Sequence, residues 1–160
     1  MIRDLRKQDT EEVIALLQRT KNFSDAEIEI ARELIDIVTT KPEQEDYFAS
    51  VAEVETDNET RRIAGFLLLG PTPATTGTYD MYWIAAHPDF QGQGIAQKLD
   101  EYAVRFVRER KGYWLIAETS SQPGYERTRG FYTKQGYQAL ARIPDYYKPG
   151  DDLIIFGKRV

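Results

Sequence analysis

The chain has 160 residues, of which 41% are hydrophobic and 29% are charged, a balance that predicts one globular domain over residues 1–160. It contains no cysteine, which excludes disulfides, thiolate metal sites and a cysteine nucleophile. Its 21 basic and 26 acidic residues give a net charge of −5, which argues against broad binding of nucleic acid.

The longest apolar runs and the first residues of the chain indicate where in the cell the protein is expected. No apolar run approaches the roughly 18 residues of a membrane-spanning helix, so we expect no membrane partner. Met1–Asp4 lacks the apolar region of a signal peptide. We therefore expect a cytoplasmic protein.

The first part of the chain predicts a short strand at Met1–Arg6 and then two helices. Asp9, with Glu12 three residues later, has the pattern of a capping box, and the apolar side of its helix carries Val13, Leu16 and Leu17. Ser24 and Glu27 repeat this pattern. The second helix is expected to reach about Val38, with a buried side made of Ile28, Ala31, Ile35 and Val38.

Three strands are predicted in the middle of the chain. Tyr47–Val54 and Arg62–Leu69 form the first two, joined by a turn around Thr56–Glu59. A loop rich in proline, threonine and glycine at Pro71–Gly77 leads to the third strand, Tyr79–Ala86.

A glycine-containing turn, Gln91–Ala96, connects this third strand to an amphipathic helix from about Gly94 to Arg110, with Gly112 as the expected helix stop. Apolar residues mark one face of the helix at Ile95, Leu99, Tyr102, Ala103 and Phe106. Glycines let backbone N–H groups approach a ligand closely, and the first N–H groups of a helix have no partner within it. A strand, a glycine turn and a helix N-terminus together predict an anion site suited to a pyrophosphate.

The remaining elements complete an alternating pattern. Tyr113–Thr119 is predicted as a strand and Tyr125–Gln135 as a helix that ends at Gly136. Tyr137–Ile143 and Leu153–Lys158 are expected to pair as strands across a loop at Asp145–Asp152. The order β-α-α-β-β-β-α-β-α-β-β predicts a mixed α/β sheet.

Two common phosphate-binding motifs do not fit the turn. A P-loop requires G-x-x-x-x-G-K-[ST], but Gly92 is followed five residues later by Gln97. The dinucleotide fingerprint G-x-G-x-x-G fails at the same glutamine, and it normally opens the first strand–helix unit of a domain rather than one past the middle.

Gln91, Gly94 and Ala96 occupy the fixed positions of [Q/R]-x-x-G-x-[G/A], a signature of the GNAT superfamily of N-acetyltransferases. The block Arg129–Tyr137 resembles the family's F-Y-x-x-x-G-[F/Y], in the usual order and at roughly the usual distance. The whole chain resembles this superfamily. The resemblance implies the GNAT fold, a mixed and mostly antiparallel sheet with helices on both faces.

The resemblance also implies that acetyl-CoA is the co-substrate, and we expect no metal. Its pantetheine arm would bond to the strand backbone at Ile84 and Ala86, with the small Ala85 between them. Its pyrophosphate would be bound by the backbone N–H groups of Gly92, Gln93, Gly94, Ile95, Ala96 and Gln97.

Amide formation needs a base and an acid, because a protonated amine must lose a proton and the departing thiolate gains from a donor. Tyr132 matches the family position whose phenol commonly protonates the sulfur. Glu118, at the end of its strand, is the candidate base, and Glu53, Glu55 or a water chain are rivals. His87 precedes Pro88 in a turn, which argues against a role in the reaction.

The terminal hairpin, Ile143–Asp152, resembles the Tyr-Tyr hairpin of protein N-terminal acetyltransferases, where the tyrosines contact the acceptor peptide. This implies that Tyr146 and Tyr147 contact the acceptor, and Phe23 is a further candidate wall of its pocket. The stretch Glu118–Tyr125 departs from that subgroup, so small amines and amino acids stay open beside peptides.

The sequence therefore predicts an N-acetyltransferase that moves an acetyl group directly from acetyl-CoA to a primary amine of a small metabolite, an amino acid or a protein or peptide. A non-catalytic, CoA-binding regulatory module is the alternative, and a nucleotide-binding protein of the dinucleotide type is a third. Association into a homodimer is left open.

Overall fold

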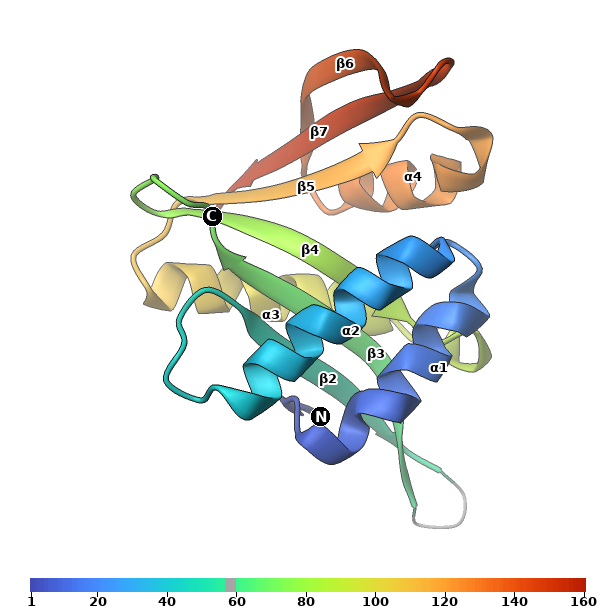
Figure 1. Ribbon diagram of the computed structural model, residues 1–160, viewed down its shortest axis with the longest axis vertical. Coiled ribbons are helices and arrows are strands. Elements are labelled where there is room, and N and C mark those ends of the chain that lie inside the picture. Colours follow the sequence, from blue (N-terminus) through green and yellow to red (C-terminus); the bar gives the residue numbers. More distant parts are fainter. Residues whose placement is uncertain (57–59) are drawn as a thin grey trace. The chain divides into compact units, whose positions relative to one another are not determined.

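The computed structural model describes residues 1–56 and 60–160 (Figure 1). It contains four α-helices and seven strands within that part of the chain, in the predicted order: β1 Ile2–Asp4, α1 Thr10–Thr20, α2 Asp25–Thr40, β2 Phe48–Glu55, β3 Arg61–Pro71, β4 Thr78–Ala86, α3 Ile95–Glu109, β5 Trp114–Ser120, α4 Glu126–Lys134, β6 Gln138–Lys148 and β7 Asp151–Arg159. The predicted turn around Thr56–Glu59 falls on residues 57–59, which lie outside the described residues.

Hydrogen bonds connect the strands in the order β1-β2-β3-β4-β5-β7-β6. The β1–β2, β2–β3, β5–β7 and β6–β7 ladders are antiparallel, and the β4–β5 ladder is parallel. This mixed, mostly antiparallel sheet with helices confirms the predicted fold class. The chain forms two compact units, one made of residues 1–70 and 83–103 and the other of residues 71–82 and 104–160.

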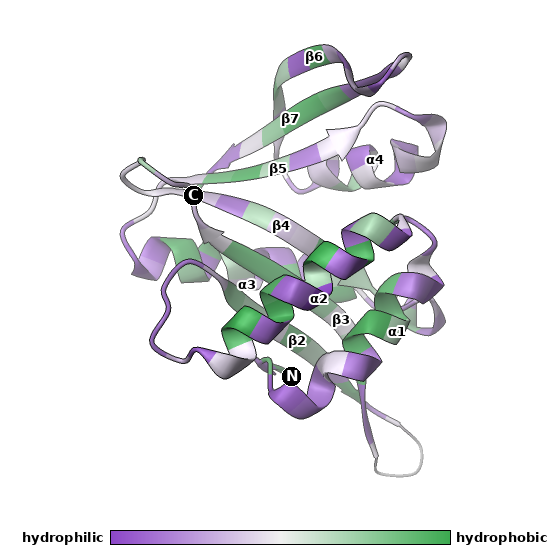
Figure 2. Ribbon diagram, viewed as in Figure 1, coloured by the Kyte–Doolittle hydropathy of each residue, from purple (hydrophilic) through white to green (hydrophobic). Residues whose placement is uncertain are grey.

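In the first unit, α1 and α2 lie on one face of β2 and β3, and the first half of α3 lies on the other (Figure 1). A Cβ added to Gly65 of β3 would lie 2.6 Å from Ile95 and 2.8 Å from Leu99 of α3, so the helix rests directly on the strand. Residues 63–70 of β3 are buried, and much of the ribbon of this strand is coloured hydrophobic (Figure 2). The fully buried side chains of this core include Leu16, Leu17, Ile35, Val51, Phe66, Leu67 and Leu99.

The capping box predicted for α2 is confirmed, whereas the one predicted for α1 is wrong. The Ser24 hydroxyl accepts the N–H of Glu27 at 3.2 Å, and the Glu27 carboxylate accepts the N–H of Ser24 at 2.7 Å. The Asp9 carboxylate instead accepts two guanidinium bonds from Arg3, at 2.6 and 3.0 Å. Glu12 accepts the backbone N–H of Ile63 at 2.9 Å. Both acids therefore bind partners outside the helix, and Asp9 makes no cap bond to α1.

In the second unit, β5 pairs along its whole length with β7. The first residues of β4, Thr78–Asp80, pair with Trp114–Ile116 of β5. Helix α4 contributes the buried Tyr132, whose ring lies 5.2 Å from Tyr137 and 5.4 Å from Phe156. This aromatic cluster anchors α4 within the unit.

The two glycine stops differ. Gly136 has φ +86°, the left-handed conformation that ends a helix, as predicted. At the end of α3 the left-handed residue is Lys111, at φ +58°, and Gly112 serves another need. A Cβ on Gly112 would lie 2.5 Å from Val107 and 2.9 Å from Tyr79, so glycine is required there by close packing.

The expected loop at Asp145–Asp152 is also corrected, because β6 runs to Lys148 and β7 begins at Asp151. The hairpin is therefore tight, and β6 contains an irregular segment between Ile143 and Lys148. Pro144 and the left-handed Asp145, at φ +53°, interrupt the ladder without ending the strand.

Candidate active site

The glycine turn before α3 leaves open space around both of its glycines. Gly92 has φ +80° and Gly94 has φ +70°, conformations that side chains disfavour. A Cβ at either position would have no atom within 4 Å. Neither glycine is therefore required by packing within the protein, and the space beside them can admit a ligand.

The backbone amides of this turn are available as donors. Within residues 1–56 and 60–160, no hydrogen bond has the N–H of any residue from Gly92 to Gln97 as its donor. The first intrahelical bond of α3 runs from Lys98 N–H to the Gly94 carbonyl at 2.9 Å. The Lys98 ammonium donates to the Gln93 carbonyl at 3.3 Å and so adds a positive charge beside the turn. The unbonded amides, the helix dipole and the charge of Lys98 all favour the binding of an anion at this turn.

The strand that leads into the turn alternates in burial. Ala85 is buried, while Ile84 and Ala86 are partly exposed. His87 N–H donates to the Ala64 carbonyl at 2.8 Å, which continues the pairing with β3 past the end of β4. The predicted pantetheine-binding residues thus lie at the end of a strand that is held firmly on its β3 side.

His87 is buried and belongs to the turn. Its Nδ1 accepts the N–H of Asp89 at 3.1 Å, and its ring lies 5.5 Å from that of Phe90. Burial lowers the pKa of His87, and nearby Arg19 and Arg62 act in the same direction against the pull of Asp89. As a neutral imidazole, His87 accepts a hydrogen bond from the Asp89 backbone and so stabilises the turn. This agrees with the prediction that His87 belongs to the turn.

In the second unit, Glu118 on β5 is accompanied by an acid that sequence reasoning missed. Although Glu118 is exposed on β5, partial desolvation raises the pKa of its carboxyl, and the negative charge of Asp80 raises it further. Burial also raises the pKa of Asp80 itself. The register pairs Asp80 of β4 with Ile116 of β5, so strand alternation places Asp80, Ile116 and Glu118 on one face.

The β4–β5 ladder covers only Thr78–Asp80 and Trp114–Ile116 among the described residues, although β5 continues to Ser120. Glu118 is therefore carried by a stretch of β5 that pairs on its β7 side with Ile155. The sequence did show an acidic residue, Asp80, within the predicted strand Tyr79–Ala86. It could not show how this strand is aligned with the strand of Glu118, and so it could not predict that the two acids interact.

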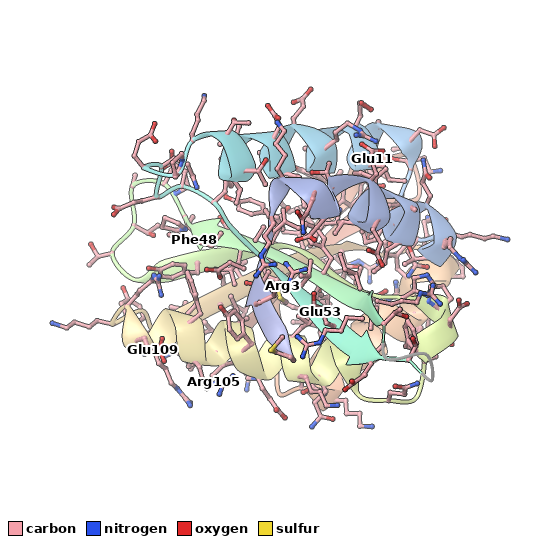
Figure 3. All side chains as sticks on the ribbon, turned by 90° about the horizontal axis from the view of Figure 1, so that it is seen from below. Arg3, Glu11, Phe48, Glu53, Arg105 and Glu109 are labelled. Atoms are coloured by element: carbon pink, nitrogen blue, oxygen red, sulfur yellow. The ribbon has the colours of Figure 1, made fainter. Side chains whose placement is uncertain are left out.

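The rival bases lie in the first unit. The Glu53 carboxylate accepts Arg3 Nε at 2.8 Å, with Arg3 Nη2 at 2.6 Å, and Arg61 lies 3.8 Å away (Figure 3). These contacts engage the Glu53 carboxylate in an ion pair within the first unit. Glu55 is exposed at the end of β2. The choice among Glu118, Glu53, Glu55 and a water chain stays a prediction.

Tyr132 lies in the aromatic cluster of the second unit and is only 5% exposed. Its ring faces those of Phe131, Tyr137 and Phe156, at 5.6, 5.2 and 5.4 Å between centroids. This packing fixes where the ring lies. Its role as an acid stays a prediction.

The predicted acceptor-binding aromatics are exposed to different degrees. Tyr146 and Tyr147 are 55% and 48% exposed, with their rings edge to face at 5.1 Å. Phe23, which lies just before α2 in the first unit, is partly exposed. The tyrosines are thus presented on the surface of β6, an unusual place for two large aromatic side chains.

The fold is a mixed α/β sheet with unbonded backbone amides at the N-terminus of α3. Residues 43–139 match the family model described as an acetyltransferase (GNAT) domain. The chain belongs to the GNAT family and is an N-acetyltransferase by that membership. A solved structure from Desulfovibrio desulfuricans, assigned to the GNAT acetyltransferases, is 36% identical, with a TM-score of 0.92 over 99% of this chain and 98% of that one.

More distant structures share the fold. The ribosomal-protein-S18-alanine N-acetyltransferase from Escherichia coli is 18% identical, with a TM-score of 0.74 over 100% of this chain and 93% of that one. An aminoglycoside 6′-N-acetyltransferase complexed with coenzyme A is 17% identical, with a TM-score of 0.72 over 99% and 96% of the two chains. Comparison with curated proteins gave no match.

None of the helices in residues 1–56 and 60–160 combines the length and the apolar character that crossing a bilayer requires. Within the same part of the chain, no three His, Asp or Glu side chains are grouped so that they could hold a metal ion.

Proposed function

We propose that the protein transfers an acetyl group directly from acetyl-CoA to the primary amine of a small metabolite, an amino acid or a peptide. The observation that carries the proposal is the set of available N–H groups from Gly92 to Gln97, beside two left-handed glycines with open space around them. A diphosphate is the ligand that such a helix N-terminus suits. We assign the backbone of Ile84 and Ala86 to the pantetheine arm.

Glu118 is the base in this proposal, and Asp80 is the group that tunes it. A base works best when its pKa lies near the working pH, and an ordinary carboxyl titrates well below neutrality. Partial desolvation and the charge of Asp80 move the pKa of Glu118 upward, toward that range. The pair also supplies negative charge that attracts the ammonium form of the acceptor before its proton is removed.

Tyr132 is the proposed acid for the departing thiolate. A phenol has an ordinary pKa near 10, so it carries its proton at neutral pH and can donate it. Its ring is held on three sides by Phe131, Tyr137 and Phe156. A rigid ring keeps the hydroxyl in one place, which proton transfer requires.

For the acceptor, we propose that Tyr146 and Tyr147 provide the contact surface, with Phe23 as a further wall. The structural neighbours include a ribosomal-protein-S18-alanine N-acetyltransferase and an aminoglycoside 6′-N-acetyltransferase, so both a peptide and small molecules belong in the test. Residues 1–160 would act as a single domain, and the cytoplasmic location stays a prediction.

The test is a panel of amines with acetyl-CoA, in which CoA release is followed with a thiol reagent and products by mass spectrometry. The panel consists of kanamycin, spermidine, lysine and a pentapeptide with a free N-terminal alanine. Release of thiol with an acetylated product supports the proposal. Saturable binding of CoA without release on any amine would favour the regulatory module instead.

A thermal-shift screen would distinguish CoA from a dinucleotide as the ligand of the glycine turn. We expect acetyl-CoA and CoA to raise the melting temperature, since a ligand that binds only the folded state stabilises it. A rise with NAD but none with CoA would overturn the assignment of the turn to CoA and favour a dinucleotide.

A further inference from the structure

The hairpin between β6 and β7 contains a segment that the strand ladder does not hold. Ile143 lies opposite Leu153, and Lys148 lies opposite Asp151, so the segment Pro144–Tyr147 faces Asp152 alone. Asp145 within it adopts φ +53°, a conformation uncommon for a residue with a side chain. Some interaction other than the ladder must therefore keep the segment in one conformation.

The side chain of Asp152 supplies that interaction. Its Oδ1 accepts the backbone N–H of Asp145 at 3.0 Å, and its Oδ2 accepts Nε of Arg142 at 2.5 Å. The Asp145 carboxylate in turn accepts the N–H of Gly150 at 2.6 Å. One carboxylate thus binds Arg142, just before the irregular segment, and Asp145 within it.

The backbone of Asp152 connects the same segment to the end of β5. Its N–H donates to the Ser121 hydroxyl at 2.8 Å, and its carbonyl accepts the Ser121 N–H at 2.9 Å. Ser121 lies three residues after Glu118, the proposed base. Asp152 is therefore one of the residues that connect the irregular segment to the end of β5, the strand of the proposed base.

Helix α4 is held to this end of β5 as well. Arg129 donates to the Ser120 and Gln122 carbonyls at 2.8 and 2.9 Å. The Ser120 hydroxyl donates at 2.5 Å to Asp151, and both residues are buried. Arg129 precedes Tyr132 by one turn of the helix. The proposed base, the helix of the proposed acid and the bulge thus share one hydrogen-bonded framework within this unit.

We propose that Asp152 is a positioning residue for the acceptor, because its carboxylate holds the Tyr146–Tyr147 segment in the conformation that binds the amine substrate. The inference rests on the proposed function, in which these two tyrosines contact the acceptor. A segment released from Asp152 would sample several conformations, and acceptor affinity falls with the fraction that is competent to bind. Neither the binding of acetyl-CoA nor the chemistry at Glu118 needs this carboxylate directly.

Asp152 acts as an ionised group. The N–H of Asp145 and the guanidinium of Arg142 lower its pKa below the ordinary value. It stays negatively charged throughout the pH range of an assay near neutrality. Substitution should consequently change the acceptor KM without changing the shape of the pH profile.

Asp152→Asn is the decisive variant, since an amide has the same size but only one oxygen. It cannot accept from both Asp145 and Arg142, and its NH2 group would face a donor. We expect the acceptor KM to rise about tenfold, the effect of losing one charged hydrogen bond, with kcat and the acetyl-CoA KM within about twofold. Asp36→Asn, which alters an exposed aspartate paired with Lys7, is the matched control and should change none of these constants.

Two further measurements separate positioning from general stability. Hydrogen exchange of the peptide that covers residues 143–150 should accelerate in Asp152→Asn but not in the control. In a Tyr146→Ala/Tyr147→Ala background, Asp152→Asn should raise the acceptor KM no further, because the residue acts through those tyrosines. If Asp152→Asn does not fold, Arg142→Gln removes one of the two bonds and should raise the acceptor KM by a smaller factor.

The outcomes are distinct. An unchanged acceptor KM with every active amine of the panel, or an additive effect in the double-alanine background, would overturn the positioning role and leave the acetyltransferase proposal intact. Absence of thiol release by the wild-type protein on every amine would overturn the proposed function, and the acceptor role of Asp152 with it.

Discussion

The substitution Gly94→Asp tests the anion site most directly, and the structure allows its effect to be estimated. Gly94 has φ +70°, so a residue with a Cβ lowers the stability by ~1–2 kcal/mol. No atom lies within 4 Å of the added Cβ, so no clash within the protein adds to this value. The melting temperature should fall by roughly 2–8 °C for a domain of this size.

The effect on CoA binding is expected to be larger than the effect on stability. A carboxylate about 5 Å from one phosphate charge, at an effective dielectric constant of about 20, is repelled by ~3 kcal/mol. The dissociation constant of CoA should therefore rise by about 100-fold or more, measured by isothermal titration calorimetry at low salt. Added salt should reduce the difference, because screening weakens the repulsion between partly exposed charges.

Gly136→Asp provides the matched control. Gly136 has φ +86° and nothing within 4 Å of an added Cβ, so it shares the strain and the open space of Gly94. It should lose at least as much stability, since the helix dipole also disfavours an acid at the end of α4, with a CoA dissociation constant within about twofold of wild type. If Gly94→Asp also stayed within about twofold, the amides of this turn would not bind the diphosphate.

Other predictions concern the proton transfers and a buried ion pair. Asp80→Asn removes a charge that raises the pKa of Glu118, so the acidic limb of the kcat/KM profile should move to lower pH, and an unmoved limb would exclude the coupling. Because the folded pKa of Asp80 is raised, its ionisation lowers stability as the pH rises through that value, and Asp80→Asn should be the more stable protein at pH 7 in urea titrations. Glu118→Gln should reduce turnover most near neutral pH and less at high pH, where the amine is already deprotonated; a flat, undiminished profile would favour a water chain. Tyr132→Phe should lower kcat with little change in CoA affinity by calorimetry, and wild-type turnover would remove the acid role. Arg3→Met leaves the carboxylate of Asp9 buried without its main partner and should lower the free energy of unfolding by about 3 kcal/mol; a loss below about 1 kcal/mol would mean that the pair is solvated.

The features that the sequence predicted correctly depend on residues close together in the chain. The box formed by Ser24 and Glu27 spans one helical turn, and the stop at Gly136 needs only the freedom of a single glycine. The unbonded amides from Gly92 to Gln97 are also a local feature, since the first amides of any helix have no partner within it, whereas the ligand they bind stays a prediction. For this reason the anion site could be proposed before any tertiary contact was known.

The features that only the tertiary structure decided depend on partners far apart in the chain. Glu12 binds the amide of Ile63, 51 residues away, so a capping pattern in the sequence did not become a cap. Asp80 raises the pKa of Glu118 because the register of two parallel strands brings them to one face. The segment expected as a loop at Asp145–Asp152 is instead a tight hairpin, because Lys148 pairs with Asp151 across the two strands. Local chemistry determines which conformation a segment can adopt, whereas the partners that compete for its side chains are known only once distant strands have paired.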